Sequence, residues 1–154
     1  RANDILCEGN EAAMFVTVFY GILNTRTGEL VYANAGHNSP CLIGAAGQVA
    51  PLASTGGVAL GVMEGLVYEE RTIALGNGDT VFCFTDGITE AFDESGNEFS
   101  EAALEEVLRE NPDPSPTALG EMVIGRVHDF AGAAPQSDDI TCLVLRRGAT
   151  EPAV

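Results

Sequence analysis

The sequence contains few basic residues: seven, all of them arginine, stand against 23 aspartates and glutamates, so the 154 residues carry a formal net charge of −16. Binding to nucleic acid rests largely on basic contacts to phosphate, and this balance therefore argues against a nucleic-acid partner. It also disfavours an anionic membrane surface. No apolar run approaches the roughly 20 residues that a membrane span needs, and no signal-peptide pattern is present, so the sequence predicts a cytoplasmic chain.

Paired cysteine motifs are absent as well. No C-x-x-C occurs, and the four cysteines are widely spaced, at Cys7, Cys41, Cys83 and Cys142. The last three lie inside apolar, strand-like runs. The pattern therefore predicts buried thiols in a reducing compartment rather than disulfides or zinc ligands.

Three motifs of well-known chemistry are also missing. The chain has no G-x-S-x-G nucleophile motif. The glycine-rich stretch 53–62 (ASTGGVALGV) lacks the frame of a phosphate-binding loop. The acidic turn 92–99 (FDESGNEF) lacks the alternating aspartates or asparagines of a calcium loop. These absences exclude the common forms of nucleophilic, nucleotide-binding and calcium-binding sites.

Alternating apolar runs and turns indicate an α+β fold. Hydrophobic residues make up 45% of the chain, which predicts a folded domain. We expect three hairpins, a final strand and two consecutive helices. The first strand, 15–23, is apolar at nearly every position and is predicted to be central and covered on both faces. The expected strands are 15–23, 29–33, 41–43, 48–52, 67–75, 80–85 and 140–146, with helices from Ser100 and over 117–130 and a proline-rich break at 111–116.

Two strand ends carry acidic residues. The apolar strand 80–85 is followed directly by Asp86 and Gly87, where glycine is expected to free the backbone to turn. Asp138 and Asp139 stand just before the last strand. Because Mg²⁺ and Mn²⁺ prefer carboxylate oxygens, we interpret Asp86 and Asp138 as ligands of one divalent-metal site. The alternative is structural, with Asp86 as a turn cap and the later pair as a solvated strand entry.

A second candidate region is the polar segment 34–40 (NAGHNSP) between two strands. Its His37 and Asn38 are candidate site-loop residues, since irregular loops between strands often carry function. The alternative is a structural turn in which both residues bond nearby backbone groups.

Five motifs in order resemble one family. They are FVTVFYGILNTRTGEL, YANAGHNSP, LGV at 60–62, GDTVFCFTDGITEAFD and FAGAAPQSDDITCLVL. Together they resemble the bacterial SpoIIE/RsbU-like branch of the metal-dependent serine/threonine protein phosphatases, the phosphatase 2C type. The resemblance spans about 5–146.

The resemblance implies an antiparallel β-sandwich flanked by helices, with manganese or magnesium at one edge in a two-metal site. It implies that Asp86 and Asp138 are metal ligands and catalytic residues, that Asp139 supports them, and that Gly87, His37 and Asn38 belong to the nearby loops. The implied activity is hydrolysis of phosphoserine or phosphothreonine on a partner protein, of the anti-sigma-factor antagonist type, by a metal-activated water.

One departure limits these implications. The family's domain begins with strands bearing a G-D-V-x-G-x-G motif, whose aspartate bridges the two metals, followed by two helices; nothing here matches that motif. We therefore predict that 1–147 is the C-terminal portion of such a domain, lacking the N-terminal strands and one helical layer, and that 148–154 is a frayed tail.

Several expectations follow from that portion. The chain alone should bind metal weakly, hydrolyse phosphate poorly or not at all, and self-associate through its uncovered apolar face. The parent protein should carry an upstream sensor or regulatory domain. The alternative function is a non-catalytic module that binds a regulatory partner through the same scaffold.

Overall fold

A computed structural model of the chain describes residues 1–110 and 115–148. The described residues divide into two compact units. The first unit comprises Arg1–Ser39 and Ala53–Leu75, and the second comprises Pro40–Leu52 and the residues from Gly76 onward. The proline-rich break predicted at 111–116 and the predicted tail at 148–154 lie largely outside the described residues.

The first unit contains a three-stranded antiparallel sheet with the strand order β1-β2-β5. Its β1–β2 hairpin was predicted from the turn at 24–28 and is confirmed. The Asn24 side chain accepts hydrogen bonds from the backbone N–H groups of Arg26 and Thr27, and Gly28 adopts a positive φ of 81° that closes the turn. The strands are β1 (Val18–Leu23), β2 (Glu29–Ala35) and β5 (Arg71–Ala74).

The prediction that the first strand is central and covered on both faces is wrong for the described residues. β1 begins at Val18 rather than Phe15 and stands at the end of the strand order. Tyr20 and Ile22 are 61% and 59% exposed. Alternate residues of a strand point to opposite faces, and β1 carries apolar residues on both, so its sequence indicates burial without indicating which neighbours supply it.

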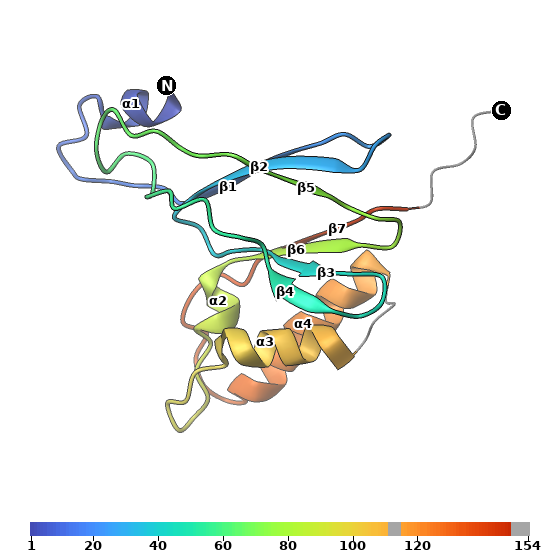
Figure 1. The fold of residues 1–154 in the computed structure, drawn as a ribbon. Coiled ribbons are helices and arrows are strands. Elements are labelled where there is room, and N and C mark those ends of the chain that lie inside the picture. Colours follow the sequence, from blue (N-terminus) through green and yellow to red (C-terminus); the bar gives the residue numbers. More distant parts are fainter. Residues whose placement is uncertain (111–114, 149–154) are drawn as a thin grey trace. The chain divides into compact units, whose positions relative to one another are not determined.

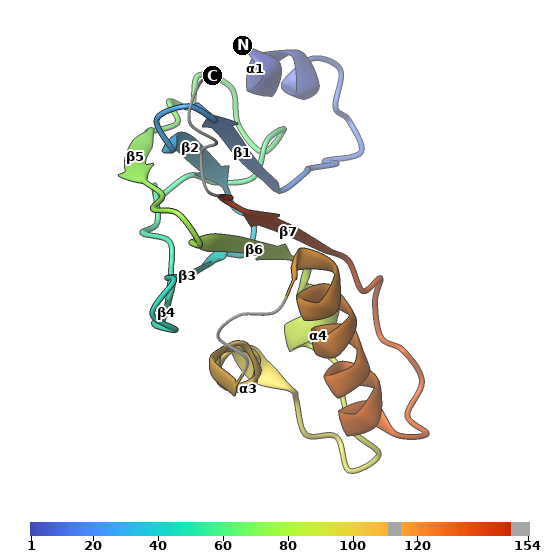
Figure 2. The ribbon, with the colours of Figure 1, turned by 90° about the vertical axis from the view of Figure 1, so that its right-hand side faces the viewer.

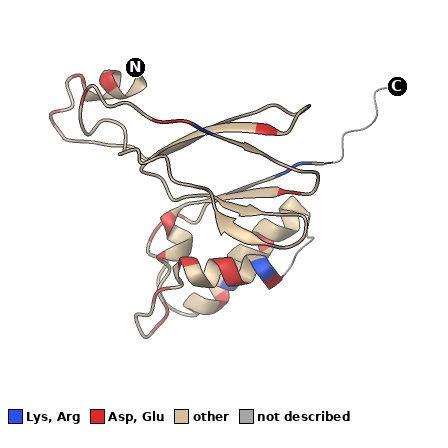
Figure 3. Ribbon diagram, viewed as in Figure 1, with Lys and Arg blue, Asp and Glu red and all other residues tan. Residues whose placement is uncertain are grey.

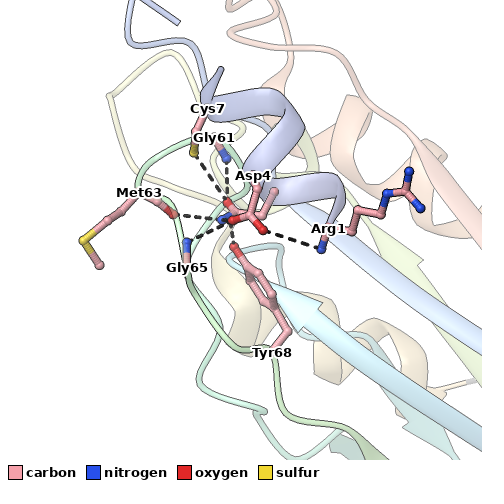
Figure 4. A network of polar contacts seen from close by, with 8 residues as sticks. Arg1, Asp4, Cys7, Gly61, Met63, Gly65 and Tyr68 are labelled. Carbon is pink, nitrogen blue, oxygen red and sulfur yellow. Dashed lines mark hydrogen bonds and ion pairs between the residues drawn. The ribbon is translucent and has the colours of Figure 1, made fainter. Parts of the chain in front are cut away.

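The first unit also contains a short helix, α1 (Ala2–Cys7), held by a buried asparagine. The Asn3 side chain is 3% exposed. Its Nδ2 donates to the carbonyl of Met63 (2.8 Å), while its Oδ1 accepts from the N–H of Gly61 (3.0 Å) and the hydroxyl of Tyr68 (3.2 Å). Figure 4 shows these contacts converging on α1 from the loop that precedes β5. The helix is therefore tied to this loop by a satisfied polar residue.

The second unit contains a four-stranded antiparallel sheet with the order β4-β3-β6-β7. The predicted β3–β4 hairpin is confirmed, with the Gly44 N–H donating to the Gln48 carbonyl (2.9 Å). The predicted hairpin of β5 with β6 is wrong, because β5 pairs with β2 and β6 pairs with β3 and β7. The strands are β3 (Cys41–Ile43), β4 (Val49–Pro51), β6 (Thr80–Phe84) and β7 (Cys142–Arg146).

Two helices, α3 (Ser100–Glu110) and α4 (Pro116–Ala131), cover one face of this sheet (Figures 1 and 2). The sequence predicted the first residue of each helix to within about one position. Ser115 caps α4 by accepting from the Ala118 N–H at 3.2 Å. Side chains from β3, β6 and the helices form one apolar core, which includes Phe82, Phe84, Ile88, Leu104, Leu108 and Val123.

The observed elements confirm an α+β fold with antiparallel sheets. Acidic residues are distributed over both units and recur along α3, as Figure 3 shows in red. Within the described ranges, no helix is both long and apolar enough to cross a membrane.

Candidate functional site

Two acidic segments meet at one edge of the four-stranded sheet. β6 and β7 are antiparallel neighbours in which Phe84, the last residue of β6, pairs with Cys142, the first residue of β7. The segment after β6 and the segment before β7 therefore lie at the same edge. The first carries Asp86 and the second carries Asp138 and Asp139, all exposed.

The backbone changes direction at Asp86 by starting a short helix. This helix, α2, spans Asp86–Thr89 with Asp86 in its first turn. Ile88, on the helix, is fully buried in the core. Because the side chain of Ile88 is buried two residues after Asp86, α2 fixes the position of Asp86 at the end of β6.

Gly87 is required here for space rather than for a special φ, which corrects the prediction that it frees the backbone. It lies in α2 and is not among the residues with positive φ. A Cβ atom at this position would lie 2.5 Å from the carbonyl oxygen of Asp139 and 3.1 Å from that of Asp138. These separations are shorter than ordinary van der Waals contacts. The absence of a side chain thus lets the start of α2 pack directly against the acidic segment before β7.

The carboxylates each make one local hydrogen bond. Asp86 Oδ1 accepts from the Gly87 N–H (3.0 Å), and Asp138 Oδ1 accepts from the Asp139 N–H (2.6 Å). Their oxygens are the donor type that Mg²⁺ and Mn²⁺ prefer, and their exposure leaves room for water ligands. Among residues 1–110 and 115–148, however, no three His, Cys, Asp or Glu side chains are grouped so as to hold a metal ion. The edge therefore offers a partial set of ligands.

Three side chains hold the segment that carries Asp138, and sequence reasoning missed all of them. Ser137 Oγ donates to the Glu90 carbonyl (3.0 Å), and Gln136 Nε2 donates to the carbonyl of Asp138 (2.8 Å). Glu94 Oε1 accepts from the Ala133 N–H (3.1 Å). The only sequence signal for Gln136 and Ser137 was their place beside the acidic pair, and Glu94 lies in the acidic turn 92–99. The contacts of Ser137 and Glu94 join the segment before β7 to the chain that follows α2, and the Gln136 contact lies within that segment.

A cavity of about 110 Å³ adjoins the acidic edge. Its walls expose polar and apolar atoms in similar proportion and are formed by α2 and the chain that follows it, the C-terminal end of α4 and the segment before β7. Gly87 and Ser137 line it, whereas Asp86 and Asp138 do not. The cavity and the carboxylates are therefore neighbours, and no Asp or Glu is among the residues that line the cavity.

His37 and Asn38 lie in the first unit, in the turn after β2. Asn34 organises this turn: its Oδ1 accepts from the His37 N–H (2.8 Å) and its Nδ2 donates to the His37 carbonyl (2.7 Å). The His37 ring nitrogen Nδ1 lies 3.2 Å from the hydroxyl of Thr17. Asn34 was not singled out from the sequence, although asparagine commonly bonds backbone groups in turns. The hydrogen bonds of Asn34 to the His37 backbone therefore account for the shape of the turn. A site role for His37 and Asn38 stays a prediction.

The three cysteines of the four-stranded sheet, Cys41, Cys83 and Cys142, have pKa values that burial raises. All four are free thiols. Burial raises the pKa of Cys41 to about 12, with nearby Glu105 adding to the effect, and burial raises the pKa of Cys83 to about 11. Thiols with such pKa values are protonated at neutral pH and are poor nucleophiles and metal ligands.

Two known proteins match nearly the whole chain in sequence. Protein IcfG from Synechocystis is 29% identical over 143 residues, which cover 93% of this chain and 22% of that protein. Phosphoserine phosphatase RsbU from Bacillus subtilis is 28% identical over 149 residues, covering 94% of this chain and 43% of that protein. The chain thus spans less than half the length of either relative.

The fold has solved counterparts too. The SiaA-PP2C domain of Pseudomonas aeruginosa superposes with a TM-score of 0.77 at 24% identity, over 93% of this chain and 56% of that one. Residues 1–148 match the family model described as stage II sporulation protein E (SpoIIE). This match covers nearly the whole chain, and the chain therefore belongs to the SpoIIE family.

Proposed function

We propose that this chain carries the C-terminal part of the active site of a Mg²⁺- or Mn²⁺-dependent protein serine/threonine phosphatase. Asp86 and Asp138 would hold the metal, and Asp139 would support them. The observation that carries the proposal is the contact of Gly87 with the carbonyls of 138–139, because it brings the two acidic segments together at one sheet edge. Family membership and the name of the relative RsbU support the phosphatase class.

The chemistry of the edge agrees with phosphate ester hydrolysis. When bound, a divalent cation would supply a water nucleophile at neutral pH and compensate the charge of the phosphoryl oxygens. Asp86 and Asp138 would orient it from two adjacent strand ends, which the β6–β7 pairing holds in register. Without a cation, clustered carboxylates repel one another and disfavour the approach of an anionic phosphate.

The substrate class is part of the proposal, and the name of the relative phosphoserine phosphatase RsbU supports it. We propose a phosphoserine or phosphothreonine on a regulatory partner protein of the anti-sigma-factor antagonist type. Such a substrate presents a dianionic group, which the exposed carboxylates could approach only through a cation. The acidic edge offers two to three carboxylates, and among residues 1–110 and 115–148 no three His, Cys, Asp or Glu side chains are grouped so as to hold a metal ion. We therefore expect weak metal binding and little activity from this chain by itself.

The test is hydrolysis of p-nitrophenyl phosphate and of a phosphoserine peptide with Mn²⁺, with and without EDTA. The proposal predicts hydrolysis that EDTA abolishes and that Asp86→Asn and Asp138→Asn each reduce by at least about 100-fold, as expected for loss of a metal-site residue. The proposal predicts this EDTA-sensitive hydrolysis for a full-length phosphatase that contains the chain. It predicts much lower hydrolysis for the 154-residue chain alone. Hydrolysis that is insensitive to EDTA would contradict it.

A second function rests on the absence of a three-donor cluster among the described residues. A module that binds a regulatory partner without catalysis would need no metal. It predicts that the Asp86→Asn and Asp138→Asn variants bind the partner as the unmodified chain does and that the longer protein hydrolyses neither substrate.

A further inference from the structure

The hydroxyl of Thr85 makes two short contacts across the acidic edge. Thr85 Oγ1 lies 2.8 Å from the carbonyl oxygen of Asp139 and 3.0 Å from the backbone nitrogen of Thr141. A threonine hydroxyl has one donor and two acceptor positions. It therefore donates to Asp139 and accepts from the Thr141 N–H at the same time.

These contacts continue the pairing of β6 with β7 beyond the regular ladder. The ladder ends at the pair Phe84–Cys142. One residue further out, the Thr85 N–H donates to the Thr141 carbonyl (3.0 Å), but the Thr141 N–H turns to the Thr85 side chain instead of a backbone carbonyl. Beyond the last backbone pair, the Thr85 side chain therefore supplies the acceptor for the Thr141 N–H.

The two partners of the hydroxyl lie on either side of Ile140, so they fix the path of the chain as it leaves Asp138 and Asp139 and enters β7. On its own strand, Thr85 directly precedes Asp86. The residue that carries this hydroxyl is therefore adjacent to Asp86 in sequence, and the hydroxyl itself is bonded to the backbone carbonyl of Asp139 in the segment before β7.

We propose that Thr85 is a positioning residue for the metal site: its hydroxyl sets the separation and register of the acidic strand ends that carry Asp86 and Asp138. The proposal rests on the proposed function. A group that only capped β6 would need one contact within the segment that follows β6, whereas both partners of this hydroxyl belong to the segment before β7. Valine, which matches threonine in shape, would keep the packing and lose both bonds; serine would keep both.

The experiment is a Mn²⁺ titration of the 154-residue chain followed by paramagnetic broadening of amide signals, which detects weak binding and shows where it occurs. The unmodified chain should show broadening centred on 86–87 and 138–139, and Asp86→Asn should reduce it. Thr85→Val should weaken Mn²⁺ binding about tenfold, the lower end of the effect of losing a group that orients metal ligands. Thr85→Ser should stay within about twofold, because it retains the donor and acceptor.

The outcomes separate the two ideas. If the unmodified chain shows no broadening at these positions, or Asp86→Asn leaves it unchanged, the metal site fails and the role of Thr85 fails with it. If both behave as expected but Thr85→Val binds Mn²⁺ like the unmodified chain, only the role of Thr85 is overturned. Equal weakening by Thr85→Ser and Thr85→Val would also overturn it, because the hydroxyl would then be irrelevant. Should Thr85→Val not fold, Thr85→Ala removes the same hydroxyl without adding a methyl group.

Discussion

Replacing Gly87 by alanine tests the packing of the acidic edge. The added Cβ would lie 2.5 Å from the Asp139 carbonyl oxygen and 2.8 Å from its carbonyl carbon. Carbon and oxygen atoms in close contact are ordinarily separated by about 3.3 Å or more, so the two segments must move apart by roughly 0.8 Å. Both contacting atoms belong to the backbone, and neither can rotate away as the end of a side chain would.

The magnitude follows from two opposing effects. Overpacking of this kind costs about 1–3 kcal/mol. Alanine in a helix is favoured over glycine by up to about 1 kcal/mol, and Gly87 lies in α2, so part of the cost is offset. We expect a net loss of about 1–2 kcal/mol in the free energy of unfolding, which for a chain of this size lowers the midpoint of thermal unfolding by about 2–8 °C. Mn²⁺ affinity should fall as well, because the carboxylates separate.

The assay is thermal unfolding followed by circular dichroism, with Gly125→Ala as the matched control. Gly125 lies inside α4, and a Cβ there meets no atom within 4 Å. The same substitution should therefore stabilise the chain by up to about 1 kcal/mol, the opposite sign. A Gly87→Ala chain that unfolds at or above the midpoint of the unmodified chain would refute the steric argument.

Three further predictions concern the two units. Asn3→Ala should lower the free energy of unfolding by about 1–3 kcal/mol, because the buried backbone groups that Asn3 bonds lose their partner; unchanged stability in a urea titration would contradict this. Ile88→Ala should cost about 2–5 kcal/mol, since the side chain is fully buried, whereas Ile22→Ala, at 59% exposure, should cost far less; equal losses would count against the assigned core. Because the pKa of Cys41 is raised to about 12 from 9.0, its thiol is protonated at pH 8, and iodoacetamide should label it slowly in the folded chain and faster both on unfolding and as the pH rises toward 12. Equal labelling rates in the folded and urea-unfolded chains would exclude the buried position.

Local sequence patterns predicted most of the elements because their causes are local. Gly28 and the side chain of Asn24 close the first hairpin, and Ser115 followed by proline opens α4. Both depend on residues within a few positions of one another. The predicted β5–β6 hairpin failed for a complementary reason: the turn at 76–79 is present, with the Asp79 N–H donating to the Gly76 carbonyl (3.2 Å), yet its two strands pair in different sheets. Turn chemistry fixes a reversal of direction, while strand partners depend on contacts distant in sequence.

The same distinction applies to the candidate site. The order of residues at each strand end was sufficient to single out Asp86 and Asp138. It could not reveal that Gly87 is needed for its small size, because the atoms it would strike belong to a segment about 50 residues away. Nor could it reveal the contacts of Thr85 and Ser137, which also join segments distant in sequence.

The central claim, that the two acidic strand ends form one metal site, is tested most directly by isothermal titration calorimetry with Mn²⁺. The unmodified chain should be compared with Asp86→Asn, Asp138→Asn and, as a control for loss of one exposed negative charge elsewhere, Glu121→Gln on α4. The account predicts weak binding that each aspartate substitution abolishes and that the control retains. No binding by the unmodified chain, or binding that neither aspartate substitution changes, would contradict it.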